Sequence, residues 1–195
     1  MTASRIICIT GGIGSGKSSV SQVLQEAGYP VYNSDQRAKE LMGRDGPLYD
    51  SIVSYFGNQA YKGGNLDRAF LAQKIFNDGA AKNYLESIVH PAVSKDFEYW
   101  QGQQGSSVLF KESALVFETN DARCDYAVLV TADLEKRIKR VLLRDSSLSE
   151  QQVRARVQNQ HSTEEVKHRA DYILSNEGSL EELRNSVNQF LSSVI

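Results

Sequence analysis

The chain has few of the residues that hold structural metals or disulfide frameworks. Its 195 residues include only two cysteines, Cys8 and Cys124, which are far apart in the sequence and lack the spacing of metal ligands. The three histidines are also too few and too scattered for a metal site. We therefore expect both cysteines to be reduced thiols in the core of a cytoplasmic protein.

Long apolar runs and a strong excess of one charge are also absent. No apolar stretch is long enough to cross a bilayer, and Ile6–Thr10 is too short for a signal peptide. The net charge of -2 argues against general binding to nucleic acid or to an anionic membrane. The hydrophobic content of 41% is enough for the core of one α/β domain.

The most informative motif lies near the N-terminus, where residues 11–18 read Gly-Gly-Ile-Gly-Ser-Gly-Lys-Ser. This run matches G-x-x-x-x-G-K-[ST], the phosphate-binding P-loop. Residues 5–10 before it have the apolar pattern of a buried strand, and the residues after it have the periodicity of an amphipathic helix. Strand, glycine loop and helix form the order that phosphate binding requires.

Each part of this motif suits the phosphates of a nucleoside triphosphate. Glycines let backbone N–H groups approach phosphate oxygens, and the following helix directs the positive end of its dipole at them. Lys17 can reach the β- and γ-phosphates, and the Ser18 hydroxyl can bind Mg²⁺. Ser15 and Ser19 either contact phosphate or cap the helix. We predict that nucleotide is bound by Gly12, Ile13, Gly14, Ser15, Gly16, Lys17, Ser18 and Ser19.

Further strand patterns alternate with helical ones along the chain. The strands are expected at 29–32, 107–112, 126–130 and 171–174, and Ser149–Gln152 has the pattern of a capping box that opens a helix. This alternation predicts an α/β fold with a mainly parallel sheet and helices on both faces. Ligands are then expected at the carboxyl ends of the strands.

One connection is too long for a simple link between strand and helix. Residues from about 43 to 105 have mostly helical patterns, with breaks expected near Gly46-Pro47, Gly63-Gly64 and His90-Pro91. A connection of this length indicates an inserted helical subdomain.

Two acidic residues follow predicted strands at the expected ligand-binding edge. Asp35 either accepts a proton from an attacking hydroxyl or caps the next helix. Glu112 has the position of a second, Mg²⁺-directed acid, so we predict a metal site formed by Ser18 and Glu112. Glu118 is a weaker candidate that could form only a surface ion pair.

A cluster of basic residues lies on one predicted helix. Most residues in such a run belong to a solvated face. Transfer of a phosphoryl group nevertheless needs cations, because negative charge develops on its oxygens. Arg140 and Arg144 share one helix face, and we favour Arg144 because it ends the helix before a predicted mobile segment. The cluster comprises Lys136, Arg137, Lys139, Arg140 and Arg144.

The ordered set of motifs resembles the dephospho-CoA kinase family over nearly the whole chain. The P-loop run from Thr10 to Ser18 and the strand that leads to Asp35 both resemble this family. Further matches occur in the expected order at Leu66-Asp67-Arg68, Ile75–Asp78, Leu85–Pro91, Arg144-Asp145, Gln160, Ala170-Asp171 and Asn176.

This resemblance implies transfer of the ATP γ-phosphoryl group to the ribose 3′-hydroxyl of dephospho-CoA, with Mg²⁺, in the last step of coenzyme A biosynthesis. It implies one P-loop kinase domain with a nucleotide-binding core (1–35, 106–132 and 170–195), a helical CoA-binding insert (about 36–105) and a lid (about 133–169). Asp35 would be the base and Arg144 the lid arginine. Lys39, Arg68 and His90 would bind dephospho-CoA, and Asn176 would lie near the adenine of ATP.

Three positions depart from the family pattern. The family usually has Asp-Ala-Asp where this chain has Asn33-Ser34-Asp35, and Lys39 and Ala114 replace the usual arginine and proline. Other P-loop proteins stay as alternatives: a nucleoside or nucleotide kinase, a GTPase switch, or a module that only binds nucleotide. The switch is disfavoured because Asn-Lys-x-Asp is absent, and the binding module because Lys17, Ser18 and Asp35 are all present.

Overall fold

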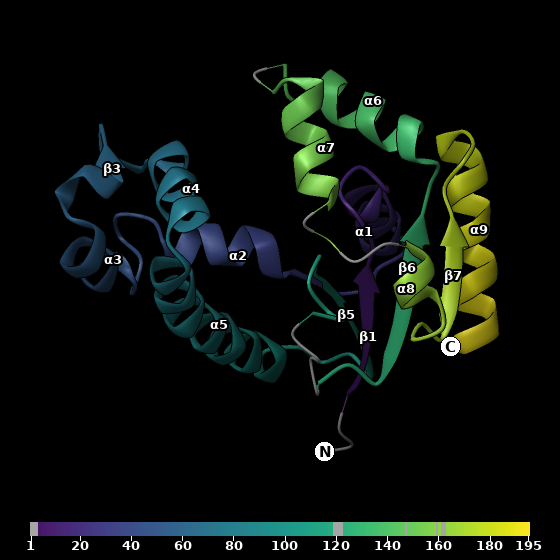
Figure 1. The fold of residues 1–195 in the computed structure, drawn as a ribbon. Coiled ribbons are helices and arrows are strands. Elements are labelled where there is room, and N and C mark those ends of the chain that lie inside the picture. Colours follow the sequence, from purple (N-terminus) through teal and green to yellow (C-terminus); the bar gives the residue numbers. More distant parts are fainter. Residues whose placement is uncertain (1–3, 119–122, 147, 159, 161–162) are drawn as a thin grey trace. The chain divides into compact units, whose positions relative to one another are not determined.

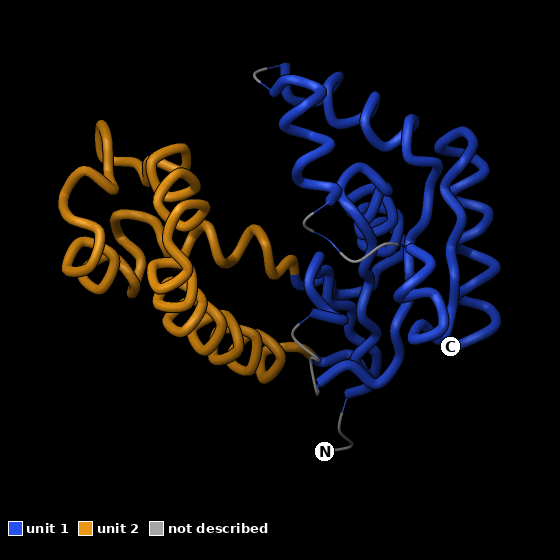
Figure 2. The backbone as a smooth tube through the Cα atoms, in the orientation of Figure 1, with its two compact units in different colours: residues 1–32, 105–195 blue, residues 33–104 orange. Residues whose placement is uncertain are grey.

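The computed structural model describes residues 4–118, 123–146, 148–158, 160 and 163–195 (Figure 1). The chain divides into two compact units (Figure 2). Unit 1 comprises residues 1–32 and 105–195, and unit 2 comprises residues 33–104.

A five-stranded sheet forms the centre of unit 1, in the order β2-β5-β1-β6-β7. β1 pairs in parallel with β5 and with β6, and β6 pairs in parallel with β7. The predicted parallel sheet is therefore confirmed, and the carboxyl ends of these four strands meet at one edge. The strands are β1 (Arg5–Thr10), β2 (Val31–Asn33), β5 (Val108–Glu112), β6 (Tyr126–Thr131) and β7 (Tyr172–Ser175).

Helices α1 (Lys17–Glu26) and α9 (Leu180–Val194) pack against one another and against the strands of this sheet (Figure 1). Burial of their apolar faces against the sheet is the main stabilising contribution in unit 1. This core comprises Ile7, Ile9, Val20, Val23, Leu24, Phe110, Val128, Val130, Leu174, Leu183, Val187 and Phe190.

Unit 1 also contains α6 (Leu134–Arg144), α7 (Glu150–Gln158) and the short α8 (Thr163–Lys167). α6 and α7 pack together around Ile138, Val141 and Val153, and Ile13 of the P-loop packs against this cluster. The predicted capping box of α7 is confirmed. Ser149 N–H donates to Gln152 Oε1 at 2.9 Å, and Gln152 N–H donates to Ser149 Oγ at 3.3 Å.

Unit 2 is largely helical and has a core of its own. α2 and α4 each pack against α5. Residues 63–64, where a break was expected, form the turn of a small antiparallel hairpin. None of the helices in the described ranges has both the length and the apolar character needed to cross a membrane. The elements are α2 (Ser34–Leu41), α3 (Tyr49–Phe56), η1 (Asn58–Ala60), β3 (Tyr61–Lys62), β4 (Asn65–Leu66), α4 (Arg68–Asn77) and α5 (Gly79–Gly102).

The expected break at His90-Pro91 was wrong, because α5 continues through both residues. Proline removes one backbone donor and normally disfavours a helix interior. A helix of 24 residues keeps its other hydrogen bonds, and the buried side chains of Ala81 and Phe97 anchor it on either side of Pro91. Tertiary packing therefore outweighs the local cost of the proline.

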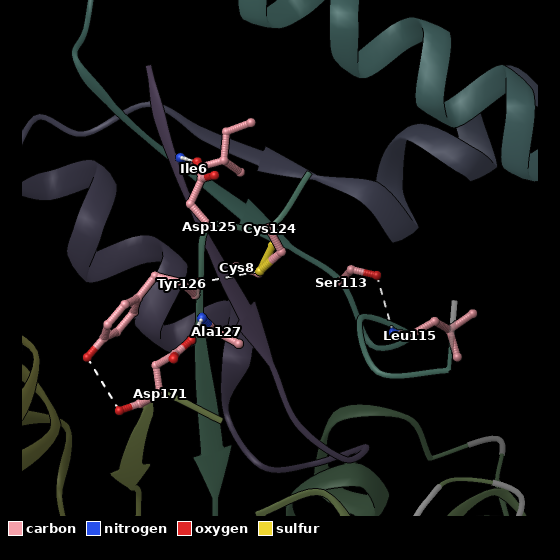
Figure 3. The surroundings of a disulfide bond; sticks show 9 residues. All are labelled: Ile6, Cys8, Ser113, Leu115, Cys124, Asp125, Tyr126, Ala127 and Asp171. Atoms are coloured by element: carbon pink, nitrogen blue, oxygen red, sulfur yellow. Dashed lines mark hydrogen bonds between the residues drawn. A yellow bond between two sulfur atoms is a disulfide. The ribbon is translucent and has the colours of Figure 1, made fainter. Parts of the chain in front are cut away.

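The expectation of two separate reduced thiols was also wrong. Cys8 and Cys124 form a disulfide, with their Cα atoms 5.7 Å apart (Figure 3). Cys8 lies in β1, and Cys124 comes just before β6, the parallel neighbour of β1. Asp125 also holds the start of β6 against β1, because its carboxylate accepts a 2.7 Å hydrogen bond from the N–H of Ile6. Separation along the sequence gave no indication that these segments are spatial neighbours.

Candidate active site

The P-loop connects the end of β1 to the start of α1 and needs glycine at particular positions. Gly14 and Gly16 have φ angles of 78° and 101°, which side chains rarely adopt. A Cβ atom at Gly14 would lie 2.4 Å from the carbonyl oxygen of Arg137, and one at Gly16 would lie 2.0 Å from Nδ2 of Asn176. Both backbone conformation and close packing therefore require glycine here.

The side chains of Lys17 and Ser15 differ in their hydrogen bonds. Lys17 Nζ donates to the carbonyl oxygens of Gly11 at 2.7 Å and Gly12 at 3.3 Å. Ser15 Oγ is buried and has no hydrogen-bond partner among the described residues. The N-cap of α1 is Gly16, with no side-chain capping bond, so the capping role considered for Ser15 and Ser19 was wrong.

An open cavity of about 390 Å³ lies between the P-loop and α6. Its volume is in the range of small-ligand sites. Arg144, the last residue of α6, lines the same cavity as Lys17 and Ser18, so the structure brings these predicted residues together. The full lining is Gly14, Gly16, Lys17, Ser18, Ser19, Arg140, Val141 and Arg144.

Arg140 is a second α6 arginine at this cavity. Its Nη2 donates to the main-chain oxygen of Asn176 at 3.0 Å, and its Nη1 is buried without a hydrogen-bond partner in the described part of the chain. The sequence pattern had paired Arg140 with Arg144 on one helix face but had favoured Arg144. Both arginines line the cavity together with residues of the P-loop.

Ser18 and Glu112, the two predicted metal residues, are in direct contact. Ser18 Oγ donates a 3.0 Å hydrogen bond to Oε1 of Glu112. Glu112 ends β5, is 3% exposed and lies opposite Ile9 of β1. A hydroxyl and a carboxylate oxygen are suitable ligands for Mg²⁺, which usually also keeps water and substrate phosphate oxygens. The residues present therefore fit this ion.

Two amide side chains hold the backbone of the P-loop from distant segments. Asn176 follows β7, is 7% exposed, and donates from Nδ2 to the carbonyl oxygen of Ser15 at 2.8 Å. Gln160 accepts a 2.8 Å hydrogen bond at Oε1 from the N–H of Ile13. The sequence indicated that Asn176 lies near a nucleotide but not that it holds the loop itself.

Sequence reasoning missed Arg137, which was assigned to the run of solvated charges. Its side chain is 8% exposed, and Nε donates to the carbonyl oxygen of Ile13 at 2.9 Å. Burial lowers the pKa of its guanidinium below the usual value. The signal that was available is spacing, since Arg137 lies four residues before the buried Val141 and shares its helix face.

Comparison with known proteins identifies the family. The sequence model of the dephospho-CoA kinase family matches residues 5–182. The chain belongs to the dephospho-CoA kinase family. A dephospho-CoA kinase of Salinibacter ruber is 41% identical over 181 residues, which cover 90% of each chain.

Solved structures agree with the fold described above. A crystal structure from Thermus thermophilus matches with a TM-score of 0.86 and 35% identity, and covers 100% of both chains. A dephospho-CoA kinase from Campylobacter jejuni matches with a TM-score of 0.66 and 24% identity over 97% of this chain and 96% of the other, and supports the fold.

The remaining residues that the kinase family resemblance singled out lie in unit 2. Asp35 is exposed in the first turn of α2. The N-cap of this helix is Asn33, whose Oδ1 accepts a 2.8 Å hydrogen bond from the N–H of Gln36. The capping alternative for Asp35 was therefore wrong, and Asn33, which replaces a family aspartate, has a structural role.

The three predicted substrate-binding residues come from three helices of unit 2. Lys39 lies on α2, Arg68 begins α4, and His90 lies in the middle of α5, and all three side chains are exposed. Because α2 and α4 each pack against α5, one helical cluster carries the three residues. Of these residues, the cations Lys39 and Arg68 suit an anionic substrate.

Proposed function

We propose that this chain transfers the γ-phosphoryl group of ATP to the ribose 3′-hydroxyl of dephospho-CoA and releases ADP and CoA. The observation that carries this proposal is the cavity shared by Lys17, Ser18 and Arg144 in a member of the dephospho-CoA kinase family. A P-loop faced by arginines is the arrangement that phosphoryl transfer needs, because catalysis depends on positioning and on stabilising negative charge.

We assign the ATP-binding roles to unit 1. P-loop N–H groups and Lys17 would hold the β- and γ-phosphates, and Arg144 would stabilise charge on the transferring group. Asn176 would lie near the adenine, in keeping with its place beside Ser15 at the end of β7. Ser18 and Glu112 would hold Mg²⁺, which neutralises charge on the phosphates when it is bound.

We assign the acceptor roles to unit 2. Asp35 would accept the proton of the 3′-hydroxyl as the new bond to phosphorus forms, since an exposed carboxylate without a capping role is available for this. Lys39, Arg68 and His90 would bind dephospho-CoA through its phosphates. The proposed insert is about 36–105 and the proposed lid about 133–169, and we place the reaction in the cytoplasm.

The test is to follow ADP release with ATP and Mg²⁺ while the acceptor is varied. We expect turnover with dephospho-CoA and none with adenosine or nucleoside monophosphates. Asp35→Asn should lower kcat by about 10²–10⁴-fold and leave ATP binding unchanged. Asp50→Asn is the matched control, because Asp50 is an exposed acid in the first turn of α3.

Two results would contradict the proposal. Turnover with another acceptor but not with dephospho-CoA would reject the substrate and leave only a P-loop kinase. Near-normal activity of Asp35→Asn with dephospho-CoA would reject Asp35 as the base.

A further inference from the structure

Arg137 is a buried cation beside the phosphate-binding loop. Its side chain is 8% exposed, and burial lowers its pKa, but arginine titrates so high that the group stays charged at neutral pH. Within the described ranges, its guanidinium forms no ion pair with a carboxylate. Its one hydrogen bond there is donated to the carbonyl oxygen of Ile13. A buried charge without a counter-charge is costly, so this position favours a nearby anion.

The packing of Arg137 against the loop is close at two glycines. A Cβ atom at Gly12 would lie 2.1 Å from Nη2 of Arg137, and one at Gly14 would lie 2.4 Å from its main-chain oxygen. A larger residue at Gly12 would displace the guanidinium group, whereas one at Gly14 would push the main chain of α6 at Arg137 away from the loop. Arg137 and these glycines therefore form one packed unit.

The hydrogen bond from Arg137 also fixes the direction of one peptide group. Nε donates to the carbonyl oxygen of Ile13, and the peptide between Ile13 and Gly14 is trans. In a trans peptide the N–H points opposite to the C=O, so the N–H of Gly14 points away from Arg137. Gly14 lines the cavity that also contains Lys17.

Other contacts hold Ile13 but leave the orientation of this peptide to Arg137. The Ile13 side chain packs in the α6–α7 cluster, and its N–H, which belongs to the preceding peptide, donates to Gln160. These contacts fix the position of the residue. Rotation of the next peptide, which carries the Gly14 N–H, is opposed by the bond to Arg137.

We propose that Arg137 is a positioning residue for the nucleotide phosphates, which directs the Gly14 N–H to them and offsets their charge from behind the loop. That the nucleotide is ATP rests on the proposed function. The effect of Arg137 depends on phosphate, so its loss should weaken binding of a polyphosphate and leave binding of a nucleoside unchanged.

The test measures dissociation constants of ATP, tripolyphosphate and adenosine for Arg137→Met and Arg137→Lys. We expect Arg137→Met to weaken the binding of ATP and of tripolyphosphate about 10–100-fold, which is the range for a hydrogen bond from a charged group. The affinity for adenosine should not change. Arg137→Lys keeps the charge and should bind ATP more tightly than Arg137→Met. Arg184→Met, which removes a partly exposed arginine of α9 that pairs with Glu26, is the control and should match the wild type.

Three outcomes would overturn the proposal. The first is an ATP affinity of Arg137→Met within twofold of the wild type, and the second is an equal loss of affinity for adenosine and for ATP. The third is an ATP affinity of Arg137→Lys no higher than that of Arg137→Met.

If Arg137→Met does not fold, Arg137→Lys alone tests the proposal, because its ammonium group cannot reproduce the hydrogen-bond geometry of Nε. We then expect the affinity for ATP to fall about threefold or more and the affinity for adenosine to stay the same. An unchanged affinity for ATP would reject the proposal. None of these assays uses an acceptor, so failure of the wild type with dephospho-CoA would reject only the proposed function.

Discussion

Ser18 Oγ donates a 3.0 Å hydrogen bond to Oε1 of Glu112, which joins the first turn of α1 to the end of β5 across 94 residues of sequence. This contact depends on the parallel pairing of β1 with β5, which brings the end of β5 beside the P-loop. It places one hydroxyl and one carboxylate where the phosphates of a bound nucleotide are expected.

The first prediction is that Glu112→Gln weakens the response to Mg²⁺. The amide preserves the shape of the side chain and can still accept the Ser18 hydrogen bond, but it removes the negative charge that attracts the ion. The Mg²⁺ concentration for half-maximal ADP release should rise about 10–100-fold, as for other changes close to a metal.

Glu181→Gln is the control for this measurement, because Glu181 is an exposed acid in the first turn of α9. Its Mg²⁺ dependence should match that of the wild type. An unchanged Mg²⁺ response in Glu112→Gln would mean that the contact with Ser18 is only structural.

The second prediction concerns Arg144. Arg144→Met should lower kcat about 10²–10³-fold, the range for loss of one group that stabilises transition-state charge. The KM for ATP should change much less, since charge on the transferring oxygens is greatest in the transition state. Steady-state kinetics with dephospho-CoA measures both quantities.

Lys139→Met is the matched control on the same helix. Lys139 lines a different surface groove with Leu142 and Leu143, away from the cavity that Arg144 lines. We expect wild-type kinetics from it. If Arg144→Met raised only the KM for ATP and left kcat unchanged, Arg144 would instead be a binding residue.

The sequence was sufficient for features that depend on local pattern. The P-loop, the alternation of strands and helices, and the capping box at Ser149 and Gln152 each have a signal within a few residues. The position of Glu112 near the phosphate-binding loop could also be predicted, because an acid at the carboxyl end of a strand lies at the ligand edge of a parallel sheet.

The features that were missed depend on long-range packing. Arg137 is buried only because α6 packs on the P-loop, and a charged residue in a basic run gives no local sign of this. Pro91 lies within a helix because surrounding contacts outweigh its local cost. Cys8 and Cys124 meet because β1 and β6 are neighbours in the sheet, which spacing in the sequence does not encode.

The third prediction tests this disulfide. The protein denatured without reductant should show no free thiol, and after reduction it should show both cysteines. The Cys124→Ser variant is the control, because it should show one thiol before reduction. Two thiols in the unreduced wild type would contradict the pairing.

The last prediction uses the capping box of α9. Ser179 Oγ accepts a 3.2 Å hydrogen bond from Glu182 N–H, and Glu182 Oε2 accepts a 2.6 Å bond from Ser179 N–H. Hydrogen bonds with the backbone and, to a smaller extent, the side chain of Ser179 lower the pKa of Glu182 below its usual value of about 4.5. Because folding stabilises the charged carboxylate, its contribution is complete above pH 4.5 and is lost as the pH falls through the lower, folded pKa.

We therefore expect Glu182→Gln to have a lower melting temperature than the wild type at pH 7. This difference in melting temperature should narrow as the pH falls below 4.5. Ser179→Ala removes the cap itself and should cost about 1 kcal/mol. Thermal unfolding from pH 7 to pH 3 measures both effects, with Glu181→Gln as the neighbouring control outside the capping box. A difference between Glu182→Gln and the wild type that stayed constant with pH would show that the carboxylate charge does not contribute to the cap.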